Sequence, residues 1–210
     1  MSSICHIVAA GDFDPAGFVL PSPGDLLIAA DAGFAHLQAL GITPDVVVGD
    51  FDSLGVLPEH PSVVQTPVVK DDTDTLTAVR LGLERGYRHF RLYGTLGGAR
   101  LDHTLANIQT LGFLLDHGAH GWLIGRGEIL TAIRNESYTF SAEYHGTLSV
   151  FAIGGEAVGV SEQGLQYTLH NATLSPFMPL GVSNAFLGQP ATVSVKTGTL
   201  LLCYASKTAN

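Results

Sequence analysis

The sequence has few cysteines, few basic residues and no long hydrophobic run, and each shortage excludes a class of protein. Its two cysteines, Cys5 and Cys203, lie almost the whole chain apart, so they form no disulfide framework of a small secreted domain. Ten Lys and Arg stand against nineteen Asp and Glu, and the net charge of −9 disfavours binding to nucleic acid. No apolar run approaches the roughly 20 residues of a membrane span, and the first residues lack the features of a signal peptide. We therefore expect a cytoplasmic protein that binds neither nucleic acid nor membrane.

The overall composition is that of a folded protein. Hydrophobic residues make up 46% of the 210 residues and charged residues only 14%, which excludes a disordered chain. At roughly 150 residues per domain, the length allows one large domain or two small ones. Because the chain is acidic, a phosphorylated ligand would need a bound cation between its phosphates and the protein's carboxylates.

The acidic residues divide the chain into two regions. All twelve aspartates lie between Asp12 and Asp116, and every later acidic residue is a glutamate. Residues 1–125 have a net charge of −8 (fourteen acidic, six basic), and residues 126–210 have −1 (five acidic, four basic). Aspartate is common in turns and helix caps, which explains part of this bias. The alternative is a cation site in the first region, built from short carboxylates.

In the first region, short apolar runs alternate with segments of helical periodicity. This alternation predicts an α/β domain, with a mostly parallel sheet and flanking helices. The helical spacing places Leu105, Ile108 and Leu115 on one face of the third helix. The expected strands are 4–10, 26–32, 45–51, 63–69, 90–94 and 121–125, and the expected helices are 34–40, 74–85 and 104–117.

The second region has no comparable helical pattern. Its apolar runs are rich in β-forming residues, with Gly, Asn and Pro between them, and this pattern is typical of an antiparallel sandwich or barrel. We expect a C-terminal all-β sandwich over residues 126–210, after an α/β domain over residues 1–125. The expected strands are 128–133, 137–142, 146–154, 165–169 and 191–205.

Charged residues follow four strands of the expected parallel sheet. In open parallel sheets, ligands bind beyond the carboxyl ends of the strands, so these residues are the first candidates for a functional site. Two Gly-rich turns lie at the same edge. The charged residues are Asp31, Asp50, Asp52, Lys70, Asp71, Asp72, Asp74, Arg100 and Asp102.

Asp50 and Asp52 are spaced as a cation site requires. Residues i and i+2 of an extended segment point the same way, so both carboxylates can face one point. Two adjacent carboxylates repel unless a cation lies between them, and Mg²⁺ prefers a few carboxylates together with water and phosphate oxygens. A pair of loop aspartates capping turns is the alternative. The acidic segment 71–74 on a neighbouring strand end favours the cation site.

Several other residues at this edge suit a phosphate, although each has an ordinary structural alternative. Lys70 would be a phosphate contact or a solvated surface lysine. Thr73 or Asp74 would cap the second helix, whose N-terminus also favours anions. Arg100 has the forked donor geometry that phosphates accept. His103 would act as a general base or simply hold a cap or loop.

Motifs of several other enzyme classes are missing. The chain contains no G-x-x-x-x-G-K-[ST] and no G-x-G-x-x-G after a strand. The protein-kinase motifs, a Cys/His zinc spacing and a G-x-S-x-G nucleophile elbow are missing too. These absences exclude P-loop proteins and disfavour serine hydrolases.

Several segments taken together resemble the thiamine pyrophosphokinase (thiamine diphosphokinase) family. They are ADAGFAHLQALGITPDVVVGDFDS (30–53), KDDTDTLTA (70–78), GTLGGARLDHTLANI (94–108) and, more weakly, GLQYTL (164–169) and GVSN (181–184). The sequence departs from the family at two points. The usual D-G-G reads D-A-G, with Ala32, and the usual G-G-R is interrupted by Ala99, which lengthens the loop before Arg100 by one residue.

The resemblance implies a homodimer whose subunits have an N-terminal α/β domain and a C-terminal β-sandwich. Members of the family use Mg²⁺ and ATP to convert thiamine into thiamine diphosphate and release AMP. A permanently cationic substrate such as thiamine also suits an acidic protein.

The resemblance also assigns roles to individual residues. It implies that Asp50, Asp52, Asp71 and Asp74 are the metal and catalytic carboxylates. General-base chemistry adds that one carboxylate, Asp74 or Asp52, would accept the proton of the thiamine hydroxyl. The thiamine side, between two subunits, would include Ser183 and Asn184. The nucleotide side would comprise Asp31, Lys70, Thr73, Arg100, Asp102 and His103.

Three other functions remain open from the sequence. The same acidic edge would serve a pyrophosphokinase for another alcohol, such as a hydroxymethylpterin. A DxD phosphatase would use Asp50 as its nucleophile. A non-catalytic Mg-nucleotide sensor is the third, although a pure binder has little need of a spare carboxylate as base.

Overall fold

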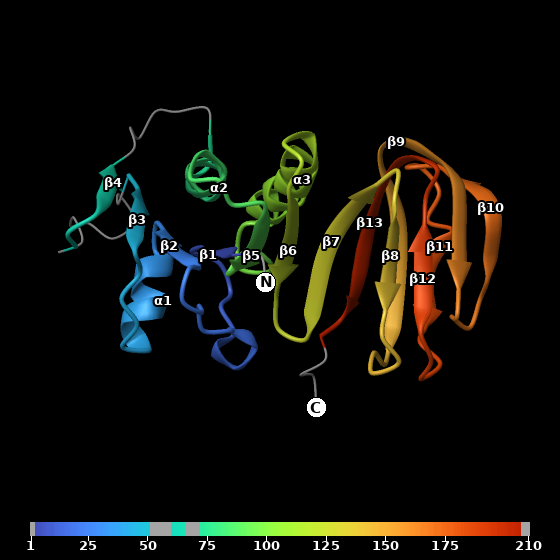
Figure 1. Ribbon diagram of the computed structural model, residues 1–210, viewed down its shortest axis with the longest axis horizontal. Coiled ribbons are helices and arrows are strands. Elements are labelled where there is room, and N and C mark those ends of the chain that lie inside the picture. Colours follow the sequence, from blue (N-terminus) through green and yellow to red (C-terminus); the bar gives the residue numbers. More distant parts are fainter. Residues whose placement is uncertain (1–2, 51–59, 66–71, 207–210) are drawn as a thin grey trace. The chain divides into compact units, whose positions relative to one another are not determined.

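The computed structural model describes residues 3–50, 60–65 and 72–206 of the chain (Figure 1). The chain divides into two compact units, residues 1–126 and residues 127–210. Helices and strands alternate in the first, whereas the described residues of the second form strands without a helix. None of the helices in the described part of the chain has both the length and the hydrophobicity to span a membrane.

The first unit contains a parallel sheet with the strand order β4-β3-β2-β1-β5-β6. The chain adds strands on one side of β1 and then moves to β5 on the other side, so the carboxyl ends of β1 and β5 form a topological switch point, where ligands bind in such sheets. The strands are β1 Ile4–Val8, β2 Leu26–Ala30, β3 Val46–Gly49, β4 Val63–Gln65, β5 His89–Tyr93 and β6 His120–Ile124. The helices are α1 Gly33–Ala39, α2 Asp74–Glu84 and α3 Leu101–Asp116, with a short 3-10 helix, η1 Pro15–Gly17.

Helices cover both faces of this sheet. Leu37 of α1 packs with Val8, Leu27 and Tyr93 on one face. On the other face, Gly82 of α2 lies against Phe90 of β5. Side chains of α3 lie close to Gly121 of β6 on that second face. This arrangement follows from strands that are apolar on both sides, as in buried parallel sheets.

The expected helix boundaries agree with α1 and α2 to within one residue, but α3 differs. It begins at Leu101 rather than 104, and its buried residues are Asn107, Thr110, Leu111 and Leu114. The face that carries Leu105, Ile108 and Leu115 is therefore not the buried face of the helix, and the Leu105 side chain is 56% exposed. The apolar pattern misled because two polar side chains of the inner face bond to backbone carbonyls and can be buried there.

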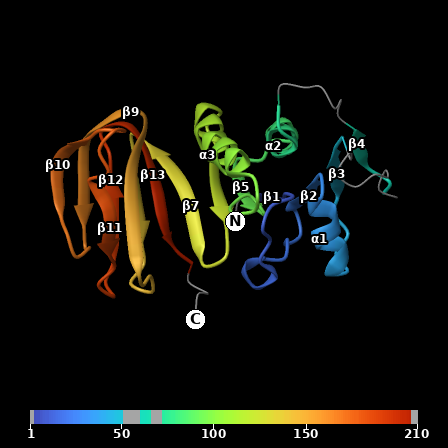
Figure 2. The same ribbon diagram turned by 180° about the vertical axis from the view of Figure 1, so that it is seen from behind.

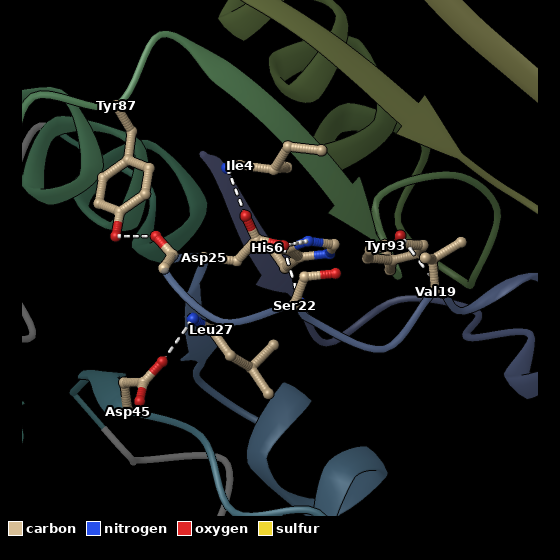
Figure 3. Close-up of polar contacts among 10 residues, drawn as sticks. Ile4, His6, Val19, Ser22, Asp25, Leu27, Asp45, Tyr87 and Tyr93 are labelled. Carbon is tan, nitrogen blue, oxygen red and sulfur yellow. Dashed lines mark hydrogen bonds and ion pairs between the residues drawn. The ribbon is translucent and has the colours of Figure 1, made fainter. Parts of the chain in front are cut away.

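Aspartates at the amino ends of the strands have structural roles (Figure 3). Asp25, just before β2, accepts hydrogen bonds from two backbone N–H groups, one of them that of Ile4 at 2.7 Å, and lies 3.4 Å from Nε2 of His6. Burial opposes its ionisation, but these donors outweigh burial and lower the pKa of Asp25. Asp45, before β3, accepts the N–H of Leu27 at 2.8 Å. Some of the aspartates in the first region therefore serve as acceptors for backbone N–H groups. These aspartates lie at the edge of the sheet opposite the predicted site.

The second unit is an antiparallel assembly built around β9, which pairs with four other strands (Figure 1, Figure 2). Its core contains Phe140, whose ring centroid lies 5.0 Å from the ring centroids of both Phe186 and Tyr204. The strands are β7 Glu128–Arg134, β8 Ser137–Phe140, β9 Thr147–Gln163, β10 Leu169–Leu174, β11 Gly181–Ala185, β12 Ala191–Ser194 and β13 Thr197–Ala205.

Three of the expected strands in this unit are wrong in extent, and β11 was not expected. The run 146–154 is only the first part of β9, which continues to Gln163. The run 165–169 is a loop that reaches β10 only at its last residue, and Leu165 makes a single bridge to Phe186. The run 191–205 is two strands, since β12 ends at Ser194 and β13 begins at Thr197. Between them, the N–H of Val195 bonds to Glu136, which lies between β7 and β8, and that of Lys196 bonds to Val158 of β9. Apolar content alone does not reveal where a strand changes partners.

Candidate functional site

A cavity of about 1240 Å³ lies at the carboxyl ends of β1, β2 and β5 in the first unit. Its walls come from the loops that follow these strands and from the first turns of α2 and α3. Five aspartates take part in the lining: Asp12, Asp14, Asp31, Asp72 and Asp74. The basic or imidazole side chains of the lining are His36, Arg100, His103 and Arg126. The lining is thus acidic, with basic groups among the carboxylates.

The loops after β1 and β5 approach each other closely at the centre of this edge. The N–H of Gly11 donates to the carbonyl of Gly94 at 2.8 Å. Gly94 has φ +63°, and a Cβ there would lie 2.3 Å from the carbonyl oxygen of Ala9. Only glycine fits this contact, because it combines a left-handed backbone with no side chain.

Asp12 ties the loop after β1 to the glycine turn that precedes α3. Its Oδ2 accepts the N–H of Gly98 at 2.9 Å, across 86 residues of sequence. Gly97 and Gly98 both have positive φ, so the turn depends on glycine and on this anchor. Asn107 holds the same loop from α3, since its Nδ2 donates to the carbonyl of Thr95 at 2.8 Å.

Four charged or imidazole residues of the lining were not among the sequence candidates: Asp12, Asp14, His36 and Arg126. The signal for the first two was present, because Gly11-Asp12-Phe13-Asp14 follows the first apolar run just as Asp31 follows the second. Applied to that run, the rule for strand ends would have found them. Asp14 also bonds to the N–H of Ala16 at the start of η1.

Asp31 lies in a strained backbone conformation directly after β2. Its φ is +50°, uncommon for a residue with a side chain, and its N–H donates to the carbonyl of Val48 at 2.8 Å. Such conformations cluster at functional sites. Ala32, which replaces the family's usual glycine, has φ −62° and ψ −7°, so alanine causes no backbone strain there.

The first turn of α2 contributes Thr73 and Asp74 to the cavity. Thr73 is the N-cap, and its Oγ1 accepts the N–H of Leu76 at 3.1 Å. The capping alternative left open by the sequence is therefore observed for Thr73. Asp74 is the first helical residue, where the helix dipole favours a negative charge. Asp72, which also lines the cavity, pairs with Arg80 at 2.7 Å.

Arg100 and Asp102 form an exposed ion pair at the first turn of α3. Nη2 of Arg100 lies 2.6 Å from Oδ2 of Asp102, and Nε lies 2.9 Å from Oδ1. Hydrogen bonding to Arg100 lowers the pKa of Asp102 to about 2, so this carboxyl is ionised at neutral pH. In this arrangement the Arg100 guanidinium donates to Asp102. A phosphate that binds Arg100 would have to share these donors with Asp102 or displace the Asp102 carboxylate from them. His103 follows on the helix and lines the cavity.

The remaining candidates of the acidic edge are only partly described. Asp50 directly follows β3, is half-buried, and is not among the residues that line the cavity. Asp52, Lys70 and Asp71 lie outside the described residues. Within the described ranges, no three Asp, Glu, His or Cys side chains lie close enough to hold a metal ion by themselves.

Ser183 and Asn184 belong to β11 of the second unit. Ser183 is exposed and has φ +61°. Asn184 is only 5% exposed, and its Nδ2 donates to Glu162 Oε2 and to the carbonyl of Tyr167, both at 2.7 Å. The two neighbouring candidates therefore differ, since one faces solvent and the other lies inside the unit.

Comparisons with known proteins agree across both units. The family described as thiamin pyrophosphokinase, catalytic domain, matches residues 20–120, and the thiamin pyrophosphokinase, vitamin B1 binding domain, matches residues 135–200. Thiamine pyrophosphokinase of Bacillus subtilis (strain 168) is 27% identical over 193 residues, which cover 84% of this chain and 86% of that protein.

Solved structures give the same result. A crystal structure of thiamine pyrophosphokinase from Bacillus subtilis has a TM-score of 0.87 and 25% identity, covering 97% of this chain and 99% of that one. The thiamin pyrophosphokinase from Geobacillus thermodenitrificans has a TM-score of 0.82 and 27% identity, with 98% and 99% covered. The two family matches fall one on each structural unit, and the similar structures cover nearly the whole chain. The chain belongs to the thiamine pyrophosphokinase family.

Proposed function

We propose that the protein transfers the diphosphate of ATP to the hydroxyl of thiamine, giving thiamine diphosphate and AMP. The observation that carries this proposal is the joint match of a catalytic and a vitamin B1 binding domain to its two units. The acidic cavity of the first unit supports it, because its volume of about 1240 Å³ is large enough for a nucleotide.

The nucleotide would bind in this cavity with its phosphates near the helix N-termini. Thr73 and Asp74 of α2 and Arg100 and His103 of α3 line it, and helix N-termini favour anions. We assign Asp31 and Asp102, together with Lys70, to the same nucleotide side. Phosphoryl transfer depends mainly on positioning and charge neutralisation, which such a set of groups supplies.

Mg²⁺ would be held by carboxylates of this edge together with the phosphates of ATP. The donor chemistry fits, since Asp74 lines the cavity and Asp50 directly follows β3, so that carboxylates with hard oxygen ligands are present at this edge. Mg²⁺ usually takes one or two carboxylates and completes its shell with water and phosphate, so a three-residue cluster is not required. The ion would neutralise charge on the triphosphate during transfer.

We assign the metal and catalytic roles to Asp50, Asp52, Asp71 and Asp74. Asp52 or Asp74 would accept the proton of the thiamine hydroxyl. If the β and γ phosphates are held as a unit, AMP is the leaving group opposite the attacking hydroxyl. No P-loop, which would grip the β and γ phosphates for transfer of the terminal one, occurs in the chain.

The second unit would close as a β-sandwich, bind thiamine and form a homodimer. Thiamine would then lie between subunits, with Ser183 on its side of the site. Several large apolar side chains of this unit are exposed, which favours an interface. They are Tyr167, Phe177, Met178, Leu180, Val182 and Leu187.

Product analysis tests the reaction. The protein is incubated with MgATP and a panel of alcohols that includes thiamine and a hydroxymethylpterin. We expect AMP and thiamine diphosphate in equal amounts, with no accumulation of thiamine monophosphate. ADP together with thiamine monophosphate would contradict the proposal, as would preference for the pterin.

A further inference from the structure

The Asn184 side chain joins three segments of the second unit and uses all of its hydrogen-bonding capacity. Its Oδ1 accepts the backbone N–H groups of Tyr167 and Ala185, both at 2.9 Å. Its Nδ2 donates to the carbonyl of Tyr167 and to Oε2 of Glu162, both at 2.7 Å. An amide offers two donors and two acceptor positions, and all four are occupied here. The side chain therefore has no polar group left for a substrate.

These bonds hold together two segments that are distant in sequence. The loop at Tyr167 is fastened to β11 by Asn184, by the N–H of Gln166 donating to the Ala185 carbonyl at 3.0 Å, and by the bridge from Leu165 to Phe186. The segments are those that match the family most weakly by sequence, GLQYTL and GVSN. Tyr167, whose backbone bonds to the buried Asn184 amide, and Ser183, which precedes Asn184, are both exposed.

Ser183 lies in a conformation that its neighbours must maintain. Its φ is +61°, and the register between β11 and β9 shifts between Gly181 and Asn184, as at a β-bulge. Its N–H donates to Oγ of Ser149 at 3.1 Å. Bulges that redirect a side chain and left-handed residues that are not glycine both concentrate at binding sites.

Glu162 is the partner of Asn184 that ordinary packing does not explain. It lies on β9, is 1% exposed, and its Oε1 has no hydrogen-bond partner within the described residues. A buried carboxyl with one unpaired oxygen is costly, and an apolar residue would fill this position without that cost. Its Oε2 fixes the direction of the Asn184 amide, because a flipped amide would bring two oxygens together.

We propose that Glu162 is a positioning residue for thiamine, acting through Asn184 to hold Tyr167 and the Ser183 bulge in the conformation that receives the substrate. This inference rests on the proposed function of the chain. It also changes the expectation for Asn184, which supports the site from inside, whereas Ser183 and Tyr167 present the contact surface. Burial raises the pKa of Glu162, whereas the hydrogen bond from Asn184 lowers it, and burial outweighs the bond. Glutamine, which is neutral and has the same shape, is therefore a close substitute for Glu162.

Two substitutions of Glu162 separate the acceptor from the charge. Glu162→Gln keeps an oxygen for Asn184, and we expect its KM for thiamine to stay within about twofold of the unmodified enzyme. Glu162→Leu removes the acceptor and leaves Nδ2 short of a partner, so the KM for thiamine should rise about tenfold or more. The KM for ATP should stay within about twofold in both, because the nucleotide cavity lies in the other unit. Glu156→Leu, an exposed position on the same strand, is the matched control and should leave both values unchanged.

A double-mutant cycle shows whether Glu162 acts through Asn184. If it does, Glu162→Leu combined with Asn184→Ala should raise the KM for thiamine no more than Asn184→Ala alone. Additive effects, an equal rise in the KM for ATP, or an unchanged KM in Glu162→Leu would overturn the proposal. Circular dichroism checks folding, and Glu162→Thr, too short to reach Asn184, replaces Glu162→Leu if that variant does not fold.

Direct binding keeps this inference separate from the proposed reaction. Calorimetric titration of the full chain with thiamine alone needs no turnover. Thiamine binding that is weakened by Glu162→Leu, in an enzyme that forms no thiamine diphosphate, would support the positioning role and overturn the proposed reaction. Thiamine binding unaffected by Glu162→Leu in an active enzyme would overturn the positioning role alone.

Discussion

A buried carboxyl makes stability depend on pH at the scale of a single residue. Burial raises the pKa of Glu162 above its usual value of 4.5 in the folded protein. The folded state therefore holds this proton more tightly than the unfolded state does. Its contribution to stability is fully present below about pH 4.5 and is lost as the pH rises through the folded-state pKa.

Glu162→Gln should remove this dependence. We expect the free energy of unfolding of the variant, relative to the unmodified protein, to be constant below about pH 4.5 and to increase above it. Each unit by which the pKa is raised corresponds to about 1.4 kcal/mol at high pH. Urea unfolding between pH 4 and 8 measures the difference, with Glu156→Gln as the exposed control. Parallel curves over the whole range would show that Glu162 is not shifted.

Asp12 has a comparable single-residue role in the first unit. Asp12→Ala removes the acceptor of the Gly98 N–H, so the glycine turn before Arg100 loses its anchor. We expect the KM for ATP to rise about tenfold, as for loss of a hydrogen bond to a charged group, with little change in the KM for thiamine. Steady-state kinetics measure both. Glu84→Ala, at an exposed residue at the end of α2 that does not line the cavity, is the control, and an equal effect there would argue against the anchor.

At the scale of the element, the first turn of α2 combines a structural and a binding feature. Thr73 caps the helix through Leu76 and lines the cavity at the same time. Thr73→Ala should lower the free energy of unfolding by about 1 kcal/mol, as loss of an N-cap does. Thr73→Ser keeps a hydroxyl cap and should be within a few tenths of a kcal/mol of the original. Chemical denaturation measures both, and equal losses would mean that the cap contributes little.

The elements of the first unit were largely predictable because their signals are local. Apolar runs bounded by turn residues gave β1 to β6, and capping and periodicity gave α1 and α2 to within a residue. The inner face of α3 was not predictable, because it includes two polar residues: Asn107 bonds to the Thr95 carbonyl of a separate loop, and Thr110 bonds to the Ala106 carbonyl one turn earlier in the same helix. The division of 191–205 into β12 and β13 likewise depends on partners from distant strands.

The candidate site shows the same limit. Residues at the end of β2 and at the starts of α2 and α3, such as Asp31, Thr73 and Arg100, were named from the sequence and line the cavity. Asp12 could have been named by the same rule for strand ends, but its contact with a turn 86 residues later could not be predicted, because nothing in the local sequence shows it. The hydrogen bonds of the Asn184 amide could not be predicted either, because its partners Glu162 and Tyr167 lie on β9 and on a separate loop.

At the scale of the whole molecule, the exposed apolar residues of the second unit point to association. Phe177 is 94% exposed, and Met178, Leu180, Val182 and Leu187 are exposed nearby in sequence. Such a set is unusual on the surface of a monomer and typical of an interface. Two copies of the chain that share it would bury these side chains, consistent with the proposed homodimer.

The double substitution Phe177→Asp with Leu180→Asp tests this association. Charges placed in an apolar interface should cost at least about 2 kcal/mol, which raises the dimer dissociation constant at least about thirtyfold. Light scattering should then give the dimer mass for the unmodified protein and the monomer mass for the variant at low micromolar concentration. Because thiamine is proposed to lie between subunits, its KM should rise in the variant while ATP still binds the cavity of the first unit.

Leu20→Asp, at an exposed apolar residue of the first unit, is the control and should leave the mass unchanged. A fully active monomer of the unmodified chain would exclude a site shared between subunits.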